Sequence, residues 1–378
     1  MMCDNRTMGQ AVIRTQADLG RRIAQAREDS GKTQSELADL VGLDRTAVVR
    51  LEAGNRKVSA TELVAIASAL ERPIDWFVTE SPPAVISRRQ NSAVGGLSRR
   101  LDLALENAAR DIAFLIEQGI LPHQGRALNT APQSFEDAET LARSIRTEAR
   151  LPEGPIHDLQ AVCEQLGLLA FSLALGPDSG DAAYVEVGDL GVAVVNGTID
   201  SGRRRFSVAH ELGHHVVGDA FEPEPRLRAS DTERMLNVFA AHFLMPRSAV
   251  QNTWDEFRNR SARLAATAVA VRFRVSWSAA CNQLRDLGII DGRERGLLVE
   301  DDLRKGEMLE LGERWVPELE PPSVPPGYAQ AVVNAYRARR LTRVRTVEFL
   351  HGTVTEPELP AIEETTLERL RRELEVEP

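Results

Sequence analysis

In the N-terminal part of the chain, apolar residues recur at the three- to four-residue spacing of short amphipathic helices. From Ala17 to Val78, single glycines and small polar residues separate these stretches. Ser81, followed by two prolines, breaks the pattern, and a polar run comes after it. The pattern therefore predicts a compact helical domain over residues 15–80 and a linker over residues 81–100.

The periodicity changes between Pro155 and Asn196. A helical stripe ends at Gly167 and is followed by two strand-like segments, 183–187 and 192–195. We expect these segments to pair as a β-hairpin, with the second strand offering an edge to an extended peptide. The segments with helical periodicity are residues 97–118, 206–217, 231–245, 264–272, 276–287 and part of the tail after residue 328.

These elements predict a fold that is mostly α with a small β-sheet. After the helical domain and the linker we expect an α+β domain over residues 101–292 and a helical C-terminal region over residues 293–378.

Residues 33–52 have the spacing of two helices joined at Gly42. Thr33 and Asp44 stand where each helix would begin, and both side chains offer an oxygen that accepts a hydrogen bond from a free backbone N–H. On the second helix, Val48 and Leu51 would face the core. The opposite face is then free to contact a ligand.

That outward face carries two arginines and a threonine. Arginine can bond the major-groove edge of guanine at two atoms, and threonine reaches a base or a methyl group. Polar residues at the start of the first helix and in the loop after the second would hold phosphates. A helical bundle with solvated arginines is the alternative. The residues that we expect to contact DNA are Gln34, Arg45, Thr46, Arg50, Asn55, Arg56 and Lys57.

Through its TQxxLA and VxRxExGxR motifs, this segment resembles the Cro/C1-type helix-turn-helix, or XRE, family over residues 17–78. The resemblance implies a five-helix bundle that binds a double-stranded DNA operator. Because domains of this type usually bind half-sites as dimers, it also implies a homodimer.

The segment 205–215 contains an HExxH motif, formed by His210, Glu211 and His214. On a helix, residues four apart project from one face, so both imidazoles can bind one zinc ion. Glu211 is displaced around the helix and would act as the general base that takes a proton from the attacking water. The alternative is that both histidines lie on the surface of an amphipathic helix. His215 lies about 100° around the helix from His214, which indicates a histidine of the core or one behind the ligands.

A third ligand must come from elsewhere, because no further histidine follows at the spacing of the metzincins. Glu233 is the only carboxylate on the largely apolar face of the helix predicted over residues 231–245. A carboxylate is costly to bury there unless it is paired or binds a metal. The alternative is a capping box, in which Glu233 bonds back to the backbone of Ser230.

The motifs RRRFSVAHELGHH, ExxxNxFAAxxLMP and FRVSWSAACNQLRDLGII resemble the ImmA/IrrE family of metallo-endopeptidases over residues 150–292. The resemblance implies His210, His214 and Glu233 as ligands of Zn²⁺ and Glu211 as the general base. It also implies a protein substrate, since members of this family inactivate helix-turn-helix repressors.

The group that would stabilise an oxyanion stays open. Tyr184, His242 and the run from Arg203 to Arg205 are candidates, and each is also typical of core packing or of a solvated helix start.

Charge and cysteine content restrict the kind of DNA contact and the cellular compartment that we expect. The net charge of −10 argues against nonspecific polyanion binding by the whole chain, so any DNA contact must be local. Cys3, Cys163 and Cys281 form no CxxC pair and favour a reducing compartment. The N-terminus has no signal pattern, and no apolar run approaches the roughly 20 residues that span a bilayer. We therefore expect a cytoplasmic protein that does not enter a membrane.

Together these features predict a transcriptional regulator whose fused zinc peptidase cuts a repressor in a stress or mobile-element response. The substrate would be a partner's repressor or the chain's own helix-turn-helix segment, with the linker as the site of self-cleavage. The alternatives are a ligand-sensing regulator that uses the zinc fold without turnover, and an antitoxin. An intact Glu211 favours chemistry, because a purely structural site would not need it.

Overall fold

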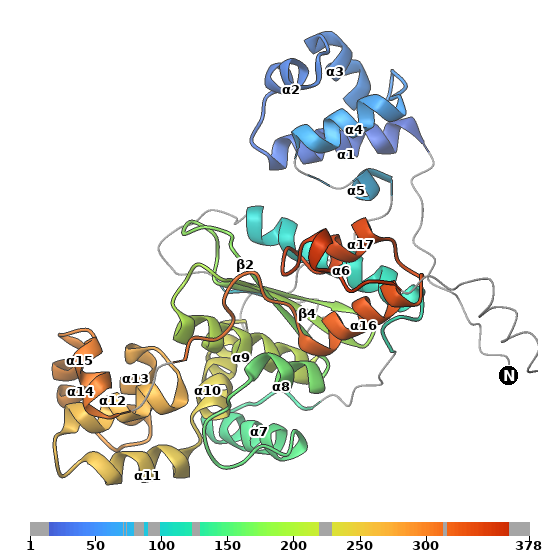
Figure 1. Cartoon of the computed structure of the whole chain (residues 1–378). Coiled ribbons are helices and arrows are strands. Elements are labelled where there is room, and N and C mark those ends of the chain that lie inside the picture. The colour runs from blue at the N-terminus through green and yellow to red at the C-terminus, as the bar shows by residue number, and fades with distance from the viewer. Residues whose placement is uncertain are drawn as a thin grey trace, which may run out of the picture. The chain divides into compact units, whose positions relative to one another are not determined.

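The computed structural model describes residues 15–70, 72, 74–78, 87–89, 99–122, 129–218, 229–312 and 316–362. The chain divides into two compact units, Met1–Pro83 and Ala84–Pro378 (Figure 1). The helix-rich N-terminal stretch and the HExxH region thus belong to different units. Of the predicted linker, residues 81–100, only 87–89 and 99–100 are described.

The first unit is a bundle of short helices around one apolar core. Its helices begin at side-chain caps: the hydroxyl of Thr33 accepts a hydrogen bond from the N–H of Glu36, and the carboxylate of Asp44 accepts one from Ala47. Gly42 ends the second helix with a φ of 68°, a left-handed conformation that glycine adopts without strain. The predicted five-helix bundle is confirmed in the described residues. Its helices are α1 (Gln16–Asp29), α2 (Gln34–Val41), α3 (Arg45–Glu52), α4 (Ala60–Ala69) and α5 (Ile74–Val78).

The second unit is built on a sheet whose strands, within the described residues, have the order β1-β3-β4-β2. The strands are β1 (Ser87–Arg89), β2 (Leu168–Leu173), β3 (Ala182–Val187) and β4 (Leu190–Asn196). β3 and β4 form the predicted antiparallel hairpin, and β2 pairs with β4 in parallel. Since β3 and β2 occupy both edges of β4, the prediction that the strand over residues 192–195 offers a free edge is wrong. β1 falls within the predicted linker and pairs antiparallel with β3.

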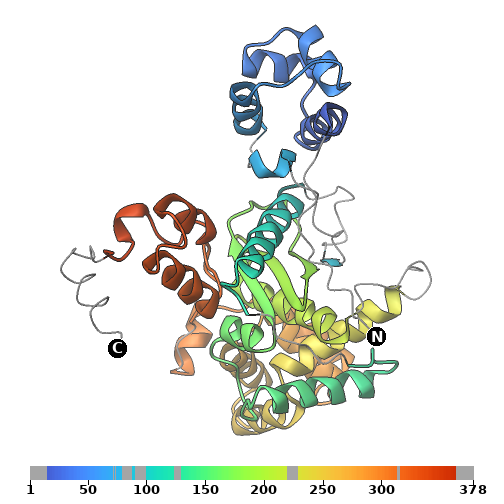
Figure 2. The same cartoon turned by 90° about the vertical axis from the view of Figure 1, so that its right-hand side faces the viewer.

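Helices cover both faces of the sheet (Figure 2). Ala193 and Val195 of β4 pack into the core that contains the HExxH helix, whereas Val192 and Val194 pack into the opposite core. Successive residues of a strand point to opposite sides, so a strand covered on both faces is apolar throughout. The first face carries α8 (Leu159–Gln165), α9 (Ser201–Val217) and α10 (Ala229–Leu244), against which α7 (Phe135–Glu148) packs. The second face carries α6 (Arg99–Glu117), α16 (Pro326–Arg337) and α17 (Arg343–Phe349).

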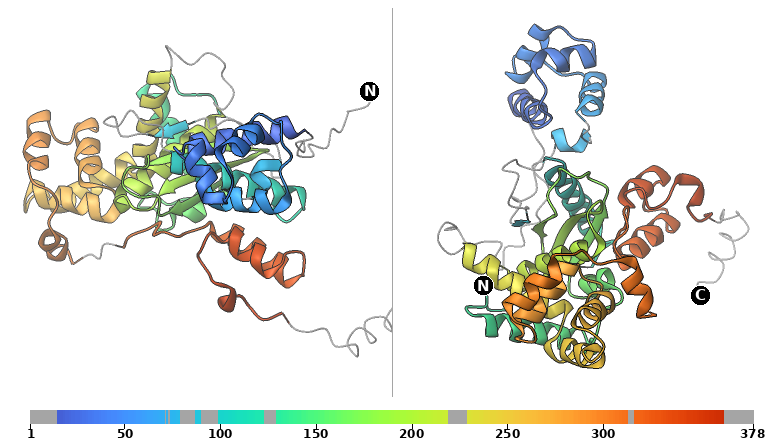
Figure 3. Two further views of the ribbon diagram at one scale, coloured as in Figure 1. Left: turned by 90° about the horizontal axis from the view of Figure 1, so that it is seen from above. Right: turned by 90° about the vertical axis from the view of Figure 1, so that its left-hand side faces the viewer.

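A further group of helices follows α10 (Figure 3). α12 is buried from Leu264 to Val271, and α11, α13 and α15 contact it. The described part of the predicted C-terminal region is helical and packs within the second unit, partly on this group and partly on the sheet. None of the described helices has the length and the apolar character that crossing a membrane requires. The group contains α11 (Arg247–Phe257), α12 (Ala262–Phe273), α13 (Trp277–Asp286), α14 (Gly292–Val299) and α15 (Lys305–Glu310), and the short helix η2 (Glu356–Glu358) follows α17.

Candidate metal centre and DNA-binding helix

Helix α9 holds His210 and His214 one turn apart, so their side chains project from the same face. Both are buried in the structure. The helix begins earlier than the predicted start at residue 206, because the carboxylate of Asp200 accepts a hydrogen bond from the N–H of Arg203 and caps it. It ends at Gly218, which has a φ of 64°. The alternative of two surface histidines on an amphipathic helix does not agree with this burial.

Gly213 allows α10 to pack closely against α9. A β-carbon at this position would lie 3.0 Å from Cδ1 of Phe239 and 3.2 Å from Cδ2 of Leu236, closer than most side chains approach one another. Both of these residues belong to α10. The close approach of the two helices brings Glu233, in the second turn of α10, next to the imidazoles of α9.

The side chains of His210, His214 and Glu233 converge. Nε2 of His210 lies 3.1 Å from Oε2 of Glu233 and 3.2 Å from Nε2 of His214. Nε2 of His214 lies 3.3 Å from Oε1 of Glu233. Tetrahedral ligands about 2.1 Å from a zinc ion are roughly 3.4 Å from one another, so the three donors have the spacing of a zinc site. Two imidazoles and one carboxylate, with a fourth position left open, are also the donor set of catalytic zinc sites.

The carboxylate of Glu233 is held in its charged form. Burial raises the pKa of this carboxyl, but hydrogen bonds with His210 and His214 outweigh that effect and hold the pKa well below its usual range. The amide of Asn237 donates a hydrogen bond of 2.8 Å to the carbonyl oxygen of Glu233 and so supports this turn of α10. The side chain of Ser230, on which the alternative capping box depends, lies outside the described residues.

Glu211 is fully buried beside these donors. Among the residues that the structure describes, neither of its carboxylate oxygens has a hydrogen-bond partner. Leaving a buried carboxylate without a partner destabilises a protein, so such a group is kept where it serves a reaction. The next residue along the helix from a metal-binding histidine is also where a general base is expected in an HExxH motif.

His215 and Tyr184 belong to the core. A hydrogen bond of 3.1 Å joins the hydroxyl of Tyr184 to Nδ1 of His215, and Nε2 of His215 lies 3.2 Å from the carbonyl oxygen of Leu166. Both side chains are fully buried. This supports the interpretation of His215 as a core histidine and gives Tyr184 a packing role.

The three arginines at the start of α9 have structural partners. Arg203 bonds both carboxylate oxygens of Asp181, at 2.7 and 2.8 Å. Arg204 donates to the carbonyl oxygen of Glu318, and the fully buried Arg205 forms an ion pair with the carboxylate of Glu318. These contacts fix the N-terminal end of α9 and account for the arginines without a role in oxyanion binding.

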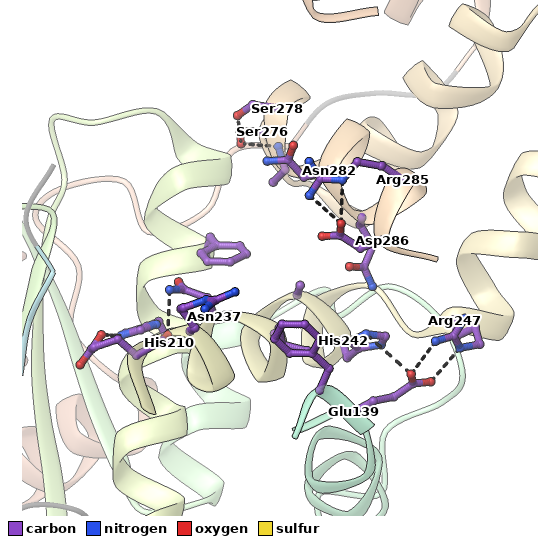
Figure 4. Close-up of a pocket in the computed structure, with 18 of the residues that line it drawn as sticks. Glu139, His210, Asn237, His242, Arg247, Ser276, Ser278, Asn282, Arg285 and Asp286 are labelled. Atoms are coloured by element: carbon purple, nitrogen blue, oxygen red, sulfur yellow. Dashed lines mark hydrogen bonds and ion pairs between the residues drawn. The ribbon is translucent and has the colours of Figure 1, made fainter. Parts of the chain in front are cut away.

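A long groove leads away from the metal centre and has a volume of about 1470 Å³. Residues of α7, α10 and α13 line it. Figure 4 shows His210 and Asn237 at one end, and the cluster of Glu139, His242 and Arg247 at the other. Burial lowers the pKa of His242, although Glu139 partly opposes this. His242 lines the groove beside Glu139, and Figure 4 shows it apart from His210, which does not support a role in stabilising an oxyanion at the metal centre.

The groove's α7 wall was not predicted from the sequence. Phe135, Glu139 and Arg143 lie on one side of α7, and this spacing of three to four residues is the signal of a helix with one functional face. The sequence alone does not say which element this face would meet.

Helix α3 presents the predicted reading face to solvent. Arg45, Thr46 and Arg50 are exposed, whereas Val48 and Leu51 are buried. The side chains predicted to read bases are therefore exposed together on one helix.

Two of the predicted phosphate-binding residues make bonds within the protein. The amide of Gln34 donates to Glu52 at 2.8 Å, and Arg56 forms an ion pair of 2.6 Å with Glu62. Asn55 and Lys57 are exposed, in the loop after α3. Arg56 would have to exchange Glu62 for a phosphate on binding DNA.

Each of the two units contains a segment that matches a known family. Residues 23–77 match the helix-turn-helix family, and residues 163–285 match the IrrE N-terminal-like domain family. The second match includes all three converging donors and Glu211, whose sequence motif led to the same family.

A curated protein similar to this chain is the radiation response metalloprotease IrrE of Deinococcus radiodurans. The two are 27% identical over 169 residues, which covers 42% of this chain and 48% of the relative. The chain thus spans about half the length of the curated relative that it matches.

Two solved structures are also similar. The restriction-modification controller protein C.AhdI of Aeromonas hydrophila is 34% identical, with 16% of this chain and 94% of that protein covered and a TM-score of 0.16. ComR of Streptococcus suis is 10% identical, with 89% and 88% covered and a TM-score of 0.16.

Proposed function

We propose that the chain is an XRE-family transcriptional regulator whose second unit is a zinc-dependent endopeptidase. One observation carries this proposal: His210, His214 and Glu233 converge beside the buried Glu211, at one end of an extended groove. The match to the IrrE N-terminal-like family and the likeness to a metalloprotease support it.

The residues divide the work of peptide hydrolysis. The two imidazoles and Glu233 would hold a zinc ion, which would supply Lewis-acid chemistry: acidification of a water molecule and polarisation of a peptide carbonyl. Glu211 takes the proton of the attacking water and delivers it to the departing amine. Since Glu211 accepts no hydrogen bond from the described residues, none of them competes for that proton. The groove along α10 holds the substrate as an extended chain.

The donor set favours turnover over a sensor or antitoxin role. A structural zinc site takes four protein ligands and has no use for a buried carboxylate beside them. Among the described residues, the group that could hold a metal has three members, which leaves one position for water and substrate.

The first unit would bind a double-stranded DNA operator in the cytoplasm, as a homodimer. Exposed side chains of α3 would read bases, and those at the start of α2 and in the loop after α3 would hold phosphates. The substrate of the peptidase would be a helix-turn-helix repressor, either that of a partner or the chain itself. The DNA-contacting residues in this proposal are Gln34, Arg45, Thr46, Arg50, Asn55, Arg56 and Lys57.

The test compares zinc-loaded wild type with Glu211→Gln. Each protein is incubated alone and with a mixed library of 14-residue peptides, and fragments are identified by mass spectrometry. We expect wild type to cut, and Glu211→Gln to be slower by about 10²–10⁴-fold while it retains its zinc. Equal cleavage by the two zinc-loaded proteins, or none by wild type, would remove the proteolytic claim.

A further inference from the structure

A second hollow lies at the N-terminal end of α9. It has a volume of about 970 Å³, and its apolar lining comes from Val275, Trp277, Val299, Leu303, Met308 and Leu309. Leu309 is 79% exposed. A single exposed leucine is ordinary, but an open hollow with several apolar walls is typical of a binding surface.

This hollow adjoins the groove, because Arg203, Ser276 and Ser278 line both. The shared wall is held in place. Gly202 lets α9 touch the turn before α13, since a β-carbon there would lie 2.2 Å from the backbone nitrogen of Ser276. The bidentate bond from Arg203 to Asp181 fixes the other side of the wall. A chain that leaves the metal centre along α9 therefore enters the hollow next.

The spacing of residues along α9 gives the distance between the metal centre and the hollow. Asp200 and Arg203 line the hollow and precede His210 by ten and seven residues (210 − 200 and 210 − 203). At about 1.5 Å per helical residue, this is roughly 10–15 Å along the axis. An extended peptide advances about 3.3 Å per residue, so the hollow lies about three to five substrate residues from the metal centre.

The charges around the hollow balance. Asp200 and Asp302 line it together with Arg203 and Lys305, two acids and two bases. They give no net attraction for a charged ligand, and a charged side chain would lose hydration against the apolar walls. The chemistry of the hollow fits leucine, isoleucine, methionine or phenylalanine.

We infer that this hollow is an apolar subsite, which binds a large apolar side chain of the peptide substrate about three to five residues from the cleaved bond. The inference rests on the proposed peptidase function and adds the specificity of that same site. Leu309 and Met308 on α15 contribute part of the subsite, together with Trp277 on α13.

The experiment uses the full chain, loaded with zinc, and the same peptide library. Cut sites are aligned, and residue frequencies are compared at each position on both sides of the cut. We expect large apolar residues to be enriched at one position about three to five residues away, on one side. For a peptide that carries leucine there, Leu309→Asp should raise KM roughly tenfold or more and leave kcat nearly unchanged, because burial of an apolar side chain contributes binding.

Leu297→Asp is the matched control, since Leu297 is 58% exposed and lines neither hollow. It should leave the profile unchanged. Cleavage that depends on Glu211 but has no apolar preference at these positions would overturn the subsite and leave the peptidase standing. So would an unchanged preference in Leu309→Asp. If no cleavage depends on Glu211, the proposed function fails, and the subsite fails with it.

Discussion

The two candidate sites place their working side chains in opposite environments. Arg45, Thr46 and Arg50 of α3 are exposed to solvent, whereas Glu211 and His210 of α9 are almost completely buried. The base edges and phosphates of DNA supply the hydrogen-bond partners when the protein binds. The side chains that contact them can therefore be exposed to solvent in the free protein. Hydrolysis of a peptide bond depends on electrostatic effects that water would weaken, so its residues are enclosed.

In the first unit, the residues proposed for function can therefore be changed with little effect on stability. In the second unit, the residues proposed for function also contribute to stability. An exposed arginine can be replaced with little effect on folding. A buried ligand or ion-pair partner cannot be replaced without consequences for the helices around it. Four changes test this contrast.

The largest effect is expected from removing a metal ligand. His214→Ala should reduce bound zinc from about one ion per chain to almost none and abolish cleavage, because two donors do not hold the ion. Operator binding should persist. Zinc content after dialysis against a mild chelator is the measurement, with the exposed His157→Ala as the matched control. Full zinc content in His214→Ala would mean that the enclosed residues do not form the site.

Next comes a change that acts on folding. Glu318→Gln leaves the fully buried Arg205 without its charge partner and weakens the contact of Glu318 with Arg274, so the second unit should lose about 3–5 kcal/mol of stability. Calorimetry should show its transition shifted down and that of the first unit unmoved. Glu310→Gln breaks an exposed pair with Arg260 and should change stability by about 1 kcal/mol or less. Equal effects of the two variants would contradict this interpretation.

A smaller effect is expected on the exposed face. Arg45→Ala should weaken operator binding by about 1–3 kcal/mol and relax discrimination at one base pair. Zinc content, cleavage and melting temperature should stay as in wild type. Gel-shift titration at fixed salt is the measurement, and Arg21→Ala, an exposed arginine of α1, is the control. A fall in melting temperature would show that the exposed face also supports the fold.

The smallest effect concerns pH, since all 7 histidines of the chain lie outside the first unit. Burial lowers the pKa of His351 to about 4, although Oδ2 of Asp111 lies 3.5 Å from its Nε2. Because the unfolded chain binds the proton more tightly, the second unit should lose roughly 1–2 kcal/mol between pH 6.5 and 5 through this residue. His351→Gln should flatten that slope, and His157→Gln should not. Denaturant unfolding at each pH measures it, and an equal slope in His351→Gln would assign the loss elsewhere.

Sequence reasoning reached the parts of the sites that depend on local spacing. HExxH needs only one helical face, and the caps at Thr33 and Asp44 are set by the next three residues. Glu233 could be predicted from the sequence, because a lone carboxylate on an apolar helix face requires a partner. These predictions depend on contacts within a single helix, or on one charged residue on an otherwise apolar helix face.

Contacts between distant segments were harder to predict. The apolar run 168–173 is short enough to suit a strand or a buried helix, so the partner of β4 was missed and the edge assigned to 192–195 was wrong. Likewise, α7 becomes a wall of the groove only through its packing on α10. Pairing of this kind depends on the whole fold.

Glu318 ties together segments that are far apart in the chain. Its carboxylate lies 2.5 Å from Arg274 and pairs with Arg205, its carbonyl oxygen accepts from Arg204 at 2.9 Å, and its N–H donates to Ser201 at 3.0 Å. All of these contacts cross residue 292, where the sequence placed the end of the peptidase domain. The cooperative folding block around His210, His214 and Glu233 therefore runs past that boundary. A chain trimmed ahead of residue 318 is expected to lose the proposed hydrolysis and to keep the proposed operator binding.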